Sequence, residues 1–160
     1  MYSRDLKTED QTMKVTNQLM TCALGALLAL AVPGMALAQD LLVVVPDQSP
    51  VQQLSESQVR QIFLGDISRV GGTRLAVVMY VDSNPVQENF LHRVLGLSVA
   101  DFNSHWMRQV FRAGGKAPGR EPGGSAVAQR VASSPGGIGV LTDQALADAS
   151  GLRAVYRTAQ

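Results

Sequence analysis

The sequence predicts an α/β fold in which a mixed, mainly parallel sheet is flanked by helices. Two short apolar runs rich in β-branched residues, at 41–45 and 75–81, have the length and composition of buried strands. Segments with helix-capping residues and a helical spacing of apolar side chains follow these runs. Because strands alternate with helices along the chain, we expect parallel strand pairs that are joined through helices.

The individual elements are expected from local signals. Ser55 and Gln58 have the spacing of a capping box, and Asn84 followed by Pro85 suits the start of a helix. A turn is expected at Gly71-Gly72. The predicted helices cover 55–64, 84–95, 98–113 and 125–133. Further strands are predicted at 137–141 and 152–156, with a short helix between them, and a glycine-rich loop at 114–124.

The N-terminal part of the chain has the features of a cleaved secretory signal. Lys14 provides a positive charge, an apolar run follows it, and residues 36–38 form a small-residue cleavage pattern. The run is shorter than the roughly 20 apolar residues of a membrane-spanning helix. We therefore expect a signal peptide at 1–38, a periplasmic domain at 39–160 and no stable membrane insertion after cleavage. Met13 is an alternative start, because the residues before it are polar and mixed in charge.

The composition of residues 39–160 excludes several classes of function. The whole chain holds 14 Lys+Arg against 13 Asp+Glu, and residues 39–160 keep its net charge of +1. This balance argues against a nucleic-acid partner. The only cysteine, Cys22, lies within the predicted signal. The domain is therefore expected to have no disulfide and no thiol chemistry.

The sequence lacks the motifs of common catalytic centres. It contains no Gly-x-Ser-x-Gly elbow, no phosphate-binding loop with Gly-Lys-Ser/Thr and no glutamate–histidine zinc motif. His92 and His105 do not have the spacing of a metal pair. Asp82 and Glu88 could form an acid–base pair, but at the start of a helix they are more simply charges that compensate its dipole. We therefore expect no enzyme activity, no metal and no cofactor.

Polar residues gather where the expected strands pass into helices. In open α/β sheets, ligands bind beyond the carboxyl ends of the strands, where helix N–H groups and the helix dipole can hold an anion. The alternative interpretation is that such residues are ordinary helix caps. The candidate ligand-binding residues are Ser49, Ser83, Asn84, Gly124 and Ser125, with Arg112 and Lys116 supplying charge from beside the glycine-rich loop.

Two further motifs stand out: residues 55–65, which end with Ile-Phe-Leu-Gly, and residues 135–140, Pro-Gly-Gly-Ile-Gly-Val. Residues 55–65 resemble a segment of the phosphate-type (PstS-like) periplasmic substrate-binding proteins that begins with Leu-Ser and ends with Ile-Phe-Leu-Gly. Residues 135–140 resemble the Pro-Gly-Ala-Ile-Gly-Tyr strand of the same family. The resemblance covers roughly 41–141. It implies a single lobe of the periplasmic-binding-protein-like (type II) fold and a ligand that is phosphate or a similar small oxyanion.

The chain also departs from that family. At the family's Arg-x-Asp-Gly-Ser-Gly-Thr turn, Tyr80 replaces the arginine and Pro85 removes an N–H donor. Full-length relatives close two lobes around the ligand, whereas residues 39–160 supply about one. The leading hypothesis is a periplasmic solute-binding protein for an oxyanion, linked to the permease of an ABC transporter. The alternative is a domain without ligand that acts as an interaction or sensory partner, for example of an envelope sensor protein.

Overall fold

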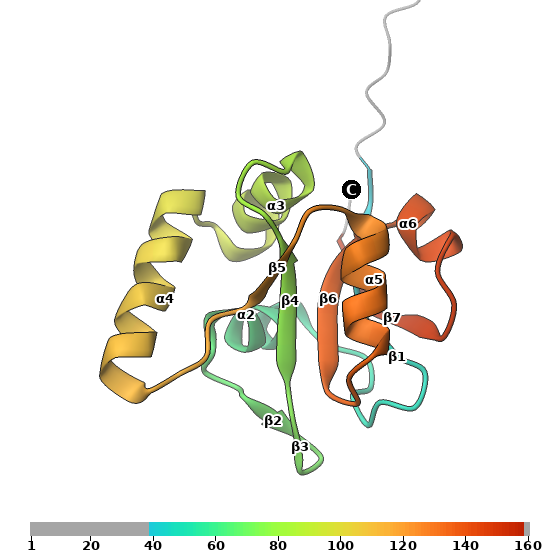
Figure 1. Ribbon diagram of the computed structural model, residues 1–160, viewed down its shortest axis with the longest axis horizontal. Coiled ribbons are helices and arrows are strands. Elements are labelled where there is room, and N and C mark those ends of the chain that lie inside the picture. The colour runs from blue at the N-terminus through green and yellow to red at the C-terminus, as the bar shows by residue number, and fades with distance from the viewer. Residues whose placement is uncertain (1–38, 159–160) are drawn as a thin grey trace, which may run out of the picture. The chain divides into compact units, whose positions relative to one another are not determined.

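The computed structural model describes residues 39–158, so the predicted signal peptide and the alternative start at Met13 lie outside the described residues. Figure 1 shows a central sheet with helices on both of its faces. The strands of this sheet are β1 (Leu41–Pro46), β4 (Ala76–Tyr80), β5 (Gly119–Glu121), β6 (Gly137–Thr142) and β7 (Leu152–Arg157). The helices are α2 (Glu56–Leu64), α3 (Pro85–Phe90), the π-helical turn η1 (Leu91–Leu95), α4 (Val99–Ala113), α5 (Gly124–Ala132) and α6 (Asp143–Ala147).

The strand order of the central sheet is β5-β4-β6-β1-β7. β4 pairs in parallel with both β5 and β6, whereas β1 runs antiparallel to β6 and to β7. Four strands therefore point one way and β1 points the other, which confirms the predicted mixed, mainly parallel sheet. No helix between residues 39 and 158 is both long enough and apolar enough to cross a membrane.

The core forms around β1, whose six residues are all buried. This explains why its sequence is a continuous apolar run rather than an alternating one. α5 packs on one face of the sheet against β4, β6 and β1. On the other face, the rings of Phe63 from α2 and Phe90 from α3 lie 4.8 Å apart.

Helix α2 confirms its predicted start and stop. The Ser55 hydroxyl accepts a hydrogen bond from the Gln58 N–H at 3.3 Å, and the Gln58 side-chain oxygen accepts one from the Ser55 N–H at 2.9 Å. Gly65 ends the helix with a φ of 88°, a conformation that favours glycine. The predicted helix at 84–95 is also present, and its second half winds as the π-helical turn η1.

Two glycines of the Pro-Gly-Gly-Ile-Gly motif allow α5 to approach β6 closely. A Cβ atom on Gly139 would lie 2.8 Å from Val131 Cγ2 and 3.1 Å from Val127 Cγ1. A Cβ atom on Gly137 would lie 2.2 Å from the Val131 carbonyl oxygen. The motif is therefore explained by the packing of a helix directly on the strand.

The segment predicted as a loop at 114–124 contains the edge strand β5. Gly119 pairs with Val78 and Glu121 pairs with Tyr80. The three residues of this strand carry no alternating apolar pattern, so only the pairing with β4 makes the segment extended. The predicted turn at Gly71-Gly72 is confirmed, and it joins the short strands β2 (Arg69–Val70) and β3 (Thr73–Arg74).

We predict that Gly139→Ala lowers the free energy of unfolding by about 1–3 kcal/mol, because the added methyl group overpacks the contact between α5 and β6. Denaturant unfolding measures the change. Gly119→Ala is the matched control, because the nearest atom to its added methyl group would be the Val77 carbonyl oxygen at 3.8 Å. Equal stability of the two variants would contradict the prediction.

Candidate functional site

Three helices begin at the same edge of the central sheet. Because β4, β5 and β6 are parallel, their carboxyl ends lie together. α3, α5 and α6 start directly after them, with Asn84, Gly123 and Thr142 as the capping residues. We call this the helix-start edge, and it consists of residues 80–85, 121–125 and 142–143. The structure thus brings four of the predicted site residues to one edge: Ser83, Asn84, Gly124 and Ser125.

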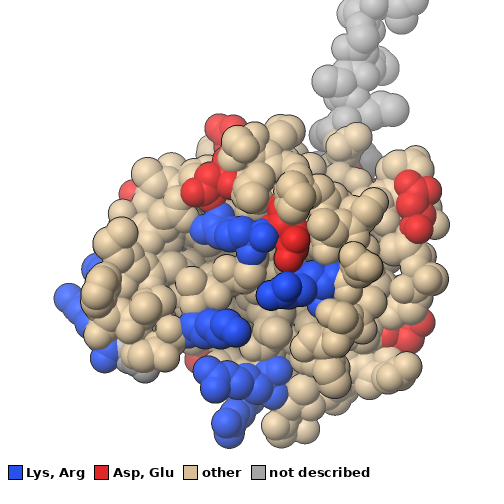
Figure 2. All heavy atoms as spheres, in the orientation of Figure 1, with Lys and Arg blue, Asp and Glu red and all other residues tan. Residues whose placement is uncertain are grey.

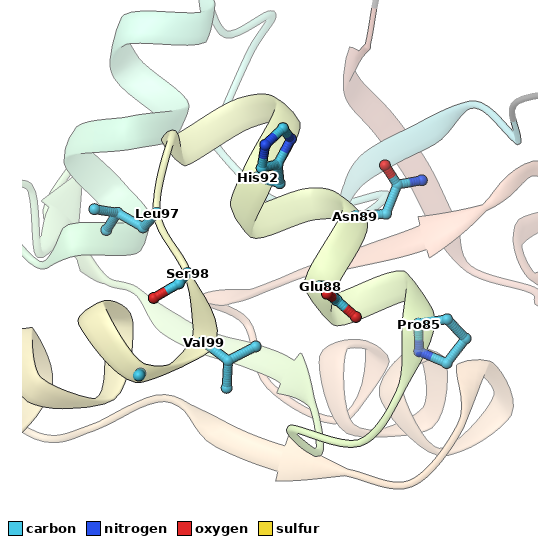
Figure 3. Close-up of a pocket in the computed structure, with 8 residues that line it drawn as sticks. Pro85, Glu88, Asn89, His92, Leu97, Ser98 and Val99 are labelled. Atoms are coloured by element: carbon cyan, nitrogen blue, oxygen red, sulfur yellow. The ribbon is translucent and has the colours of Figure 1, made fainter.

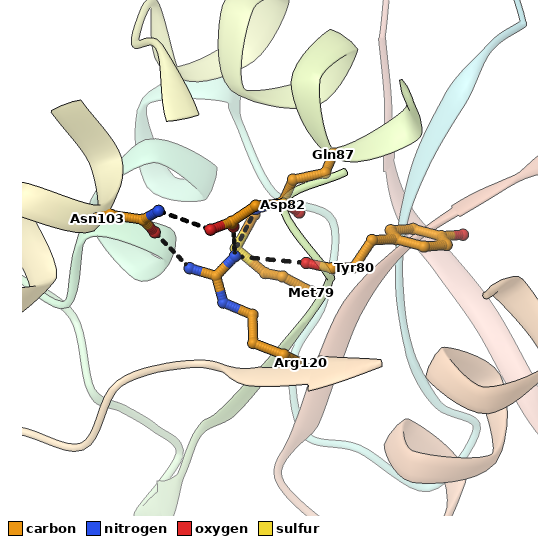
Figure 4. Close-up of polar contacts among 6 residues, drawn as sticks. All are labelled: Met79, Tyr80, Asp82, Gln87, Asn103 and Arg120. Carbon is orange, nitrogen blue, oxygen red and sulfur yellow. Dashed lines mark hydrogen bonds and ion pairs between the residues drawn. The ribbon is translucent and has the colours of Figure 1, made fainter. Parts of the chain in front are cut away.

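Asp82, Asn103 and Arg120 form a closed polar network at this edge (Figure 4). Asn103 donates from Nδ2 to Asp82 Oδ2 at 2.7 Å, and Arg120 donates from Nη2 to Asn103 Oδ1 at 2.7 Å. Arg120 Nη1 donates to Asp82 Oδ1 and also to the Tyr80 carbonyl oxygen at 3.4 Å. The network joins the end of β4, helix α4 and strand β5.

The network compensates the positive charge of Arg120. Its guanidinium group forms an ion pair with Asp82 and lies 5.7 Å from the centre of the Phe102 ring. An incoming anion would have to compete with the Asp82 carboxylate for this cation. Arg120 therefore holds β5 against β4 and α4 in this structure.

Asn84 connects the starts of α3 and α5. Its Oδ1 atom accepts a hydrogen bond from the Val86 N–H at 2.9 Å, which is the expected helix cap. Its Nδ2 atom donates to the Pro122 carbonyl oxygen at 3.2 Å. Because Pro122 lies two residues before Gly124, this bond fixes the two helix starts beside each other.

Among the α-helices of the described chain, α5 has the least compensated start. No side chain caps it, and its first turn contains no acidic residue. The first turns of α2, α3, α4 and α6 each contain one: Glu56, Glu88, Asp101 and Asp143. The partial positive charge of the helix dipole therefore remains available at α5.

Tyr80 lies beside this helix start. The residue is 2% exposed, and its hydroxyl oxygen would lie 3.5 Å from a Cβ atom built on Gly124. Burial raises the pKa of Tyr80 to about 12, so the hydroxyl group is a protonated donor near neutral pH. The sequence patterns did not indicate Tyr80 as a ligand-binding candidate, although a tyrosine that ends a buried strand was a usable signal.

The exposed hydroxyl groups of Ser83 and Ser125 flank these two helix starts. Ser83 precedes the Asn84 cap, and Ser125 lies in the first turn of α5.

Another ion-pair cluster lies at the same edge, where Arg157 contacts Asp40 at 3.0 Å and Asp143 at 2.9 Å. Hydrogen bonds to these two carboxylates raise the pKa of Arg157.

The structure does not place Ser49 at the helix-start edge. β1 runs opposite to β4 and β6, so its carboxyl end lies at the other end of the sheet. Ser49 is buried there, its hydroxyl accepts a hydrogen bond from the Val51 N–H at 3.3 Å, and its carbonyl oxygen accepts one from Arg153 at 3.0 Å. The expectation that Ser49 joins the other candidates is wrong, because local patterns do not give strand direction.

Arg112 and Lys116 are exposed and lie away from the helix-start edge. Arg112 is nine residues beyond Asn103 along α4, which corresponds to roughly 13 Å of helix. Lys116 precedes the start of β5, which pairs with the middle of β4.

On the face shown in Figure 2, basic side chains extend from the centre to the lower part, whereas acidic side chains lie close to the basic ones near the top.

A second feature, which the sequence did not indicate, is an open surface pocket of about 600 Å³ between α3, η1 and the start of α4 (Figure 3). Its polar members include Glu88 and His92, which are four residues apart and share a helix face. Ser98 also lines it, but its hydroxyl donates to Asp101 at 2.6 Å. The remaining lining residues are Pro85, Asn89, Leu97, Val99 and Ala100.

We predict that the free energy of unfolding decreases as the pH rises from about 10 to about 12, because the unfolded chain releases the Tyr80 proton near pH 10 and the folded chain keeps it to about 12. Tyr80→Phe should remove part of this decrease. Denaturant unfolding across this pH range measures it. An identical pH dependence in both proteins would contradict a buried, protonated hydroxyl group.

No family model and no curated protein matches the sequence. Among solved structures, the fold is similar to an ABC-type phosphate transport receptor from Vibrio cholerae, with 21% sequence identity and a TM-score of 0.58. It is also similar to a protein from Clostridium perfringens solved with bound phosphate, with 16% identity and a TM-score of 0.59. A third similar structure is PstS from Borrelia burgdorferi, with 12% identity and a TM-score of 0.57.

Each match covers 73% of this chain but only 45%, 44% and 46% of the other chain, respectively. The chain thus spans less than half the length of these proteins. At sequence identities of 21%, 16% and 12%, this similarity shows a shared fold alone. The described part of the chain therefore has an α/β fold similar to that of somewhat less than half of each of the three structures.

Proposed function

We propose that this chain is a non-enzymatic solute-binding domain of the bacterial periplasm that holds a small oxyanion, such as phosphate, at the helix-start edge. The observation that carries the proposal is the uncapped start of α5, which has no acidic residue in its first turn. Free N–H groups and the helix dipole at such a start attract anions. The likeness in fold to phosphate transport receptors supports the same ligand class.

In the proposed site, the N–H groups of Gly124 and Ser125 face the anion from α5. The Asn84–Pro122 hydrogen bond holds the start of α3 next to them. Ser83 and Ser125 are both exposed, so each can turn its hydroxyl group toward a ligand. Asn84 positions the two helices, because its own side chain already makes bonds within the chain.

The proposed site lies on an open edge, so water and salt compete with the protein for the anion. Binding by this chain alone should therefore be weak and should decrease as ionic strength rises. The chain spans less than half the length of the similar receptors. Excluding water from the bound anion therefore requires a second protein surface. The permease of an ABC transporter is the partner that we propose for this surface.

An interaction or sensory role without ligand is the second candidate, and a specific observation favours it. Helix α4 exposes three large apolar side chains: Met107 is 62% exposed, Val110 39% and Phe111 83%. Exposed apolar clusters of this kind mark protein contacts. In this role, Asp82 permanently satisfies Arg120, and the domain serves as a docking module for an envelope protein.

Titration with phosphate separates these two candidates. The oxyanion role predicts saturable shifts of the Gly124 and Ser125 amide signals in NMR spectra of the purified chain, and weaker binding at high salt. The absence of any shift at millimolar phosphate and low salt would leave the interaction role as the function. Sulfate and arsenate, tested in the same way, define how broad the anion class is.

We predict that Asp82→Asn strengthens anion binding about two- to fivefold, because it removes the carboxylate that balances Arg120 while keeping a similar shape. The same NMR titration measures the change. Lys116→Ala is the control and should leave the affinity within twofold, because Lys116 is exposed and distant from the helix-start edge. Weaker binding in Asp82→Asn would show that the carboxylate supports the site.

A further inference from the structure

We infer that the second half of α4 is a docking site for a membrane surface rich in anionic phospholipid. The inference is independent of the oxyanion function, because it concerns a part of the molecule away from the helix-start edge. The site combines apolar side chains that project from the helix with cations beside them. We call it the α4 patch, and its members are Met107, Arg108, Val110, Phe111, Arg112 and Lys116.

Helix α4 is attached to the core through residues that precede this patch. The indole Nε1 of Trp106 donates to the Phe63 carbonyl oxygen at 3.2 Å, and the ring nitrogen Nε2 of His105 lies 2.7 Å from the Leu64 carbonyl oxygen. Both bonds fix α4 on the last turn of α2. The helix then continues beyond Trp106 to Ala113. Its last turns are therefore held in place by this anchor, while the α4 patch remains exposed to solvent.

The apolar members of the α4 patch share one side of the helix. Met107, Val110 and Phe111 are separated by three and four positions, so their side chains are neighbours. No other large apolar side chain of residues 39–158 is exposed, and Phe111 alone is 83% exposed. Apolar surface in water is unfavourable, and another apolar medium that covers it removes this cost. The cluster therefore indicates a contact outside the chain.

The cations of the α4 patch have no anionic partner within the described chain. Arg108, Arg112 and Lys116 are exposed, and none of them forms an ion pair there. Other exposed arginines, such as Arg60 and Arg130, pair with a neighbouring glutamate. The segment 102–120 contains no Asp or Glu, so its positive charge is not balanced locally. Charge complementarity therefore favours an anionic partner.

Projecting apolar side chains beside unpaired cations are the features that an anionic lipid surface recognises. The apolar groups enter the boundary between headgroups and acyl chains, and the cations contact the lipid phosphate groups. Binding of this kind is reversible and involves no membrane-spanning helix. A protein that covers the same apolar side chains is the other candidate occupant. The cations favour the lipid, because an apolar protein contact has no need of three unpaired charges around it.

The surroundings of the α4 patch have the same sign of charge. The C-terminal end of α4 points away from the helix-start edge, toward the end of the molecule that carries the β2–β3 hairpin (Figure 1). This hairpin carries two further exposed arginines, Arg69 and Arg74, which form no ion pair among the described residues. An anionic surface would therefore orient the domain with this end toward the lipid and leave the helix-start edge in solution.

Flotation with lipid vesicles tests the inference. The sample is residues 39–160, the predicted processed chain, which contains every described helix and strand and the whole core. We expect binding at low salt to vesicles that contain phosphatidylglycerol, and at least tenfold weaker binding to vesicles of phosphatidylcholine alone. Binding to the anionic vesicles should decrease as the salt concentration rises.

Charge removal tests the cations of the patch. Arg108→Gln combined with Arg112→Gln should weaken binding to the anionic vesicles about 10- to 30-fold. The matched control is Arg60→Gln combined with Arg130→Gln. It removes the same charge from ion-paired positions on α2 and α5 and should stay within about twofold of the wild type.

Two substitutions of Phe111 test the apolar contact. Phe111→Ala should weaken vesicle binding about five- to tenfold, and its fold should be unchanged because the side chain is 83% exposed. Phe111→Trp should bind like the wild type, and its fluorescence emission should shift to shorter wavelength on anionic vesicles. The wild-type emission should hardly change, because its only tryptophan, Trp106, is 8% exposed.

The inference is overturned if the wild-type protein does not bind anionic vesicles at low salt, or if the arginine and Phe111→Ala variants bind them as well as it does. A dimer in light scattering that forms without lipid and that Phe111→Ala dissociates would assign the patch to a second copy of the chain instead. None of these results affects the oxyanion function, which the phosphate titration tests separately. The patch variants should bind phosphate as the wild type does.

Discussion

The parallel pairing of β4 with both of its neighbours is the constraint on which the helix-start edge depends. Val78 pairs with Gly119 on one side and with Gly139 on the other. This register places the carboxyl ends of three strands at one level, so the helices that follow them start together. Without it, the polar turns after Tyr80, Glu121 and Thr142 would be separate caps with no common surface.

The charges at the edge are organised in pairs within the chain rather than left free for a ligand. Arg120 bridges to Asp82 and Asn103, and Arg157 bridges to Asp40 and Asp143. Partly exposed ion pairs of this kind add little stability individually. Their main effect is to join segments distant in sequence and to lower the net electrostatic field at the edge.

The sequence predicted those parts of the fold that local patterns determine. The β1 strand, the capping box at Ser55 and the cap at Asn84 were correct because a few neighbouring residues decide each of them. The direction of β1 was not predictable in this way, and Ser49 was consequently placed at the wrong edge. Strand direction depends on which partners pair, and that is decided across the whole chain.

The candidate site shows the same division. Asn84, Gly124 and their serine neighbours were predicted as candidates because caps and glycine turns leave a local signal, and the structure places them at one edge of the sheet. Arg120 contacts Asp82 across 38 positions of sequence, and Asn103 contacts Arg120 across 17. β5, which carries Arg120, has no strand pattern of its own. Such contacts require the tertiary pairing, so no local motif could have revealed them.

The antiparallel course of β1 has a practical consequence. Leu41 pairs with Thr142 at the end of β6, and the Thr158 N–H donates to the Leu41 carbonyl oxygen at 2.9 Å. Affinity tags or fluorophores attached just before Leu41 or just after Thr158 would thus crowd the helix-start edge. Residues 39–158 contain no cysteine. A single thiol introduced at the exposed Arg69, on the β2–β3 hairpin at the far end of the sheet, would give an anchoring point that leaves the helix-start edge unobstructed.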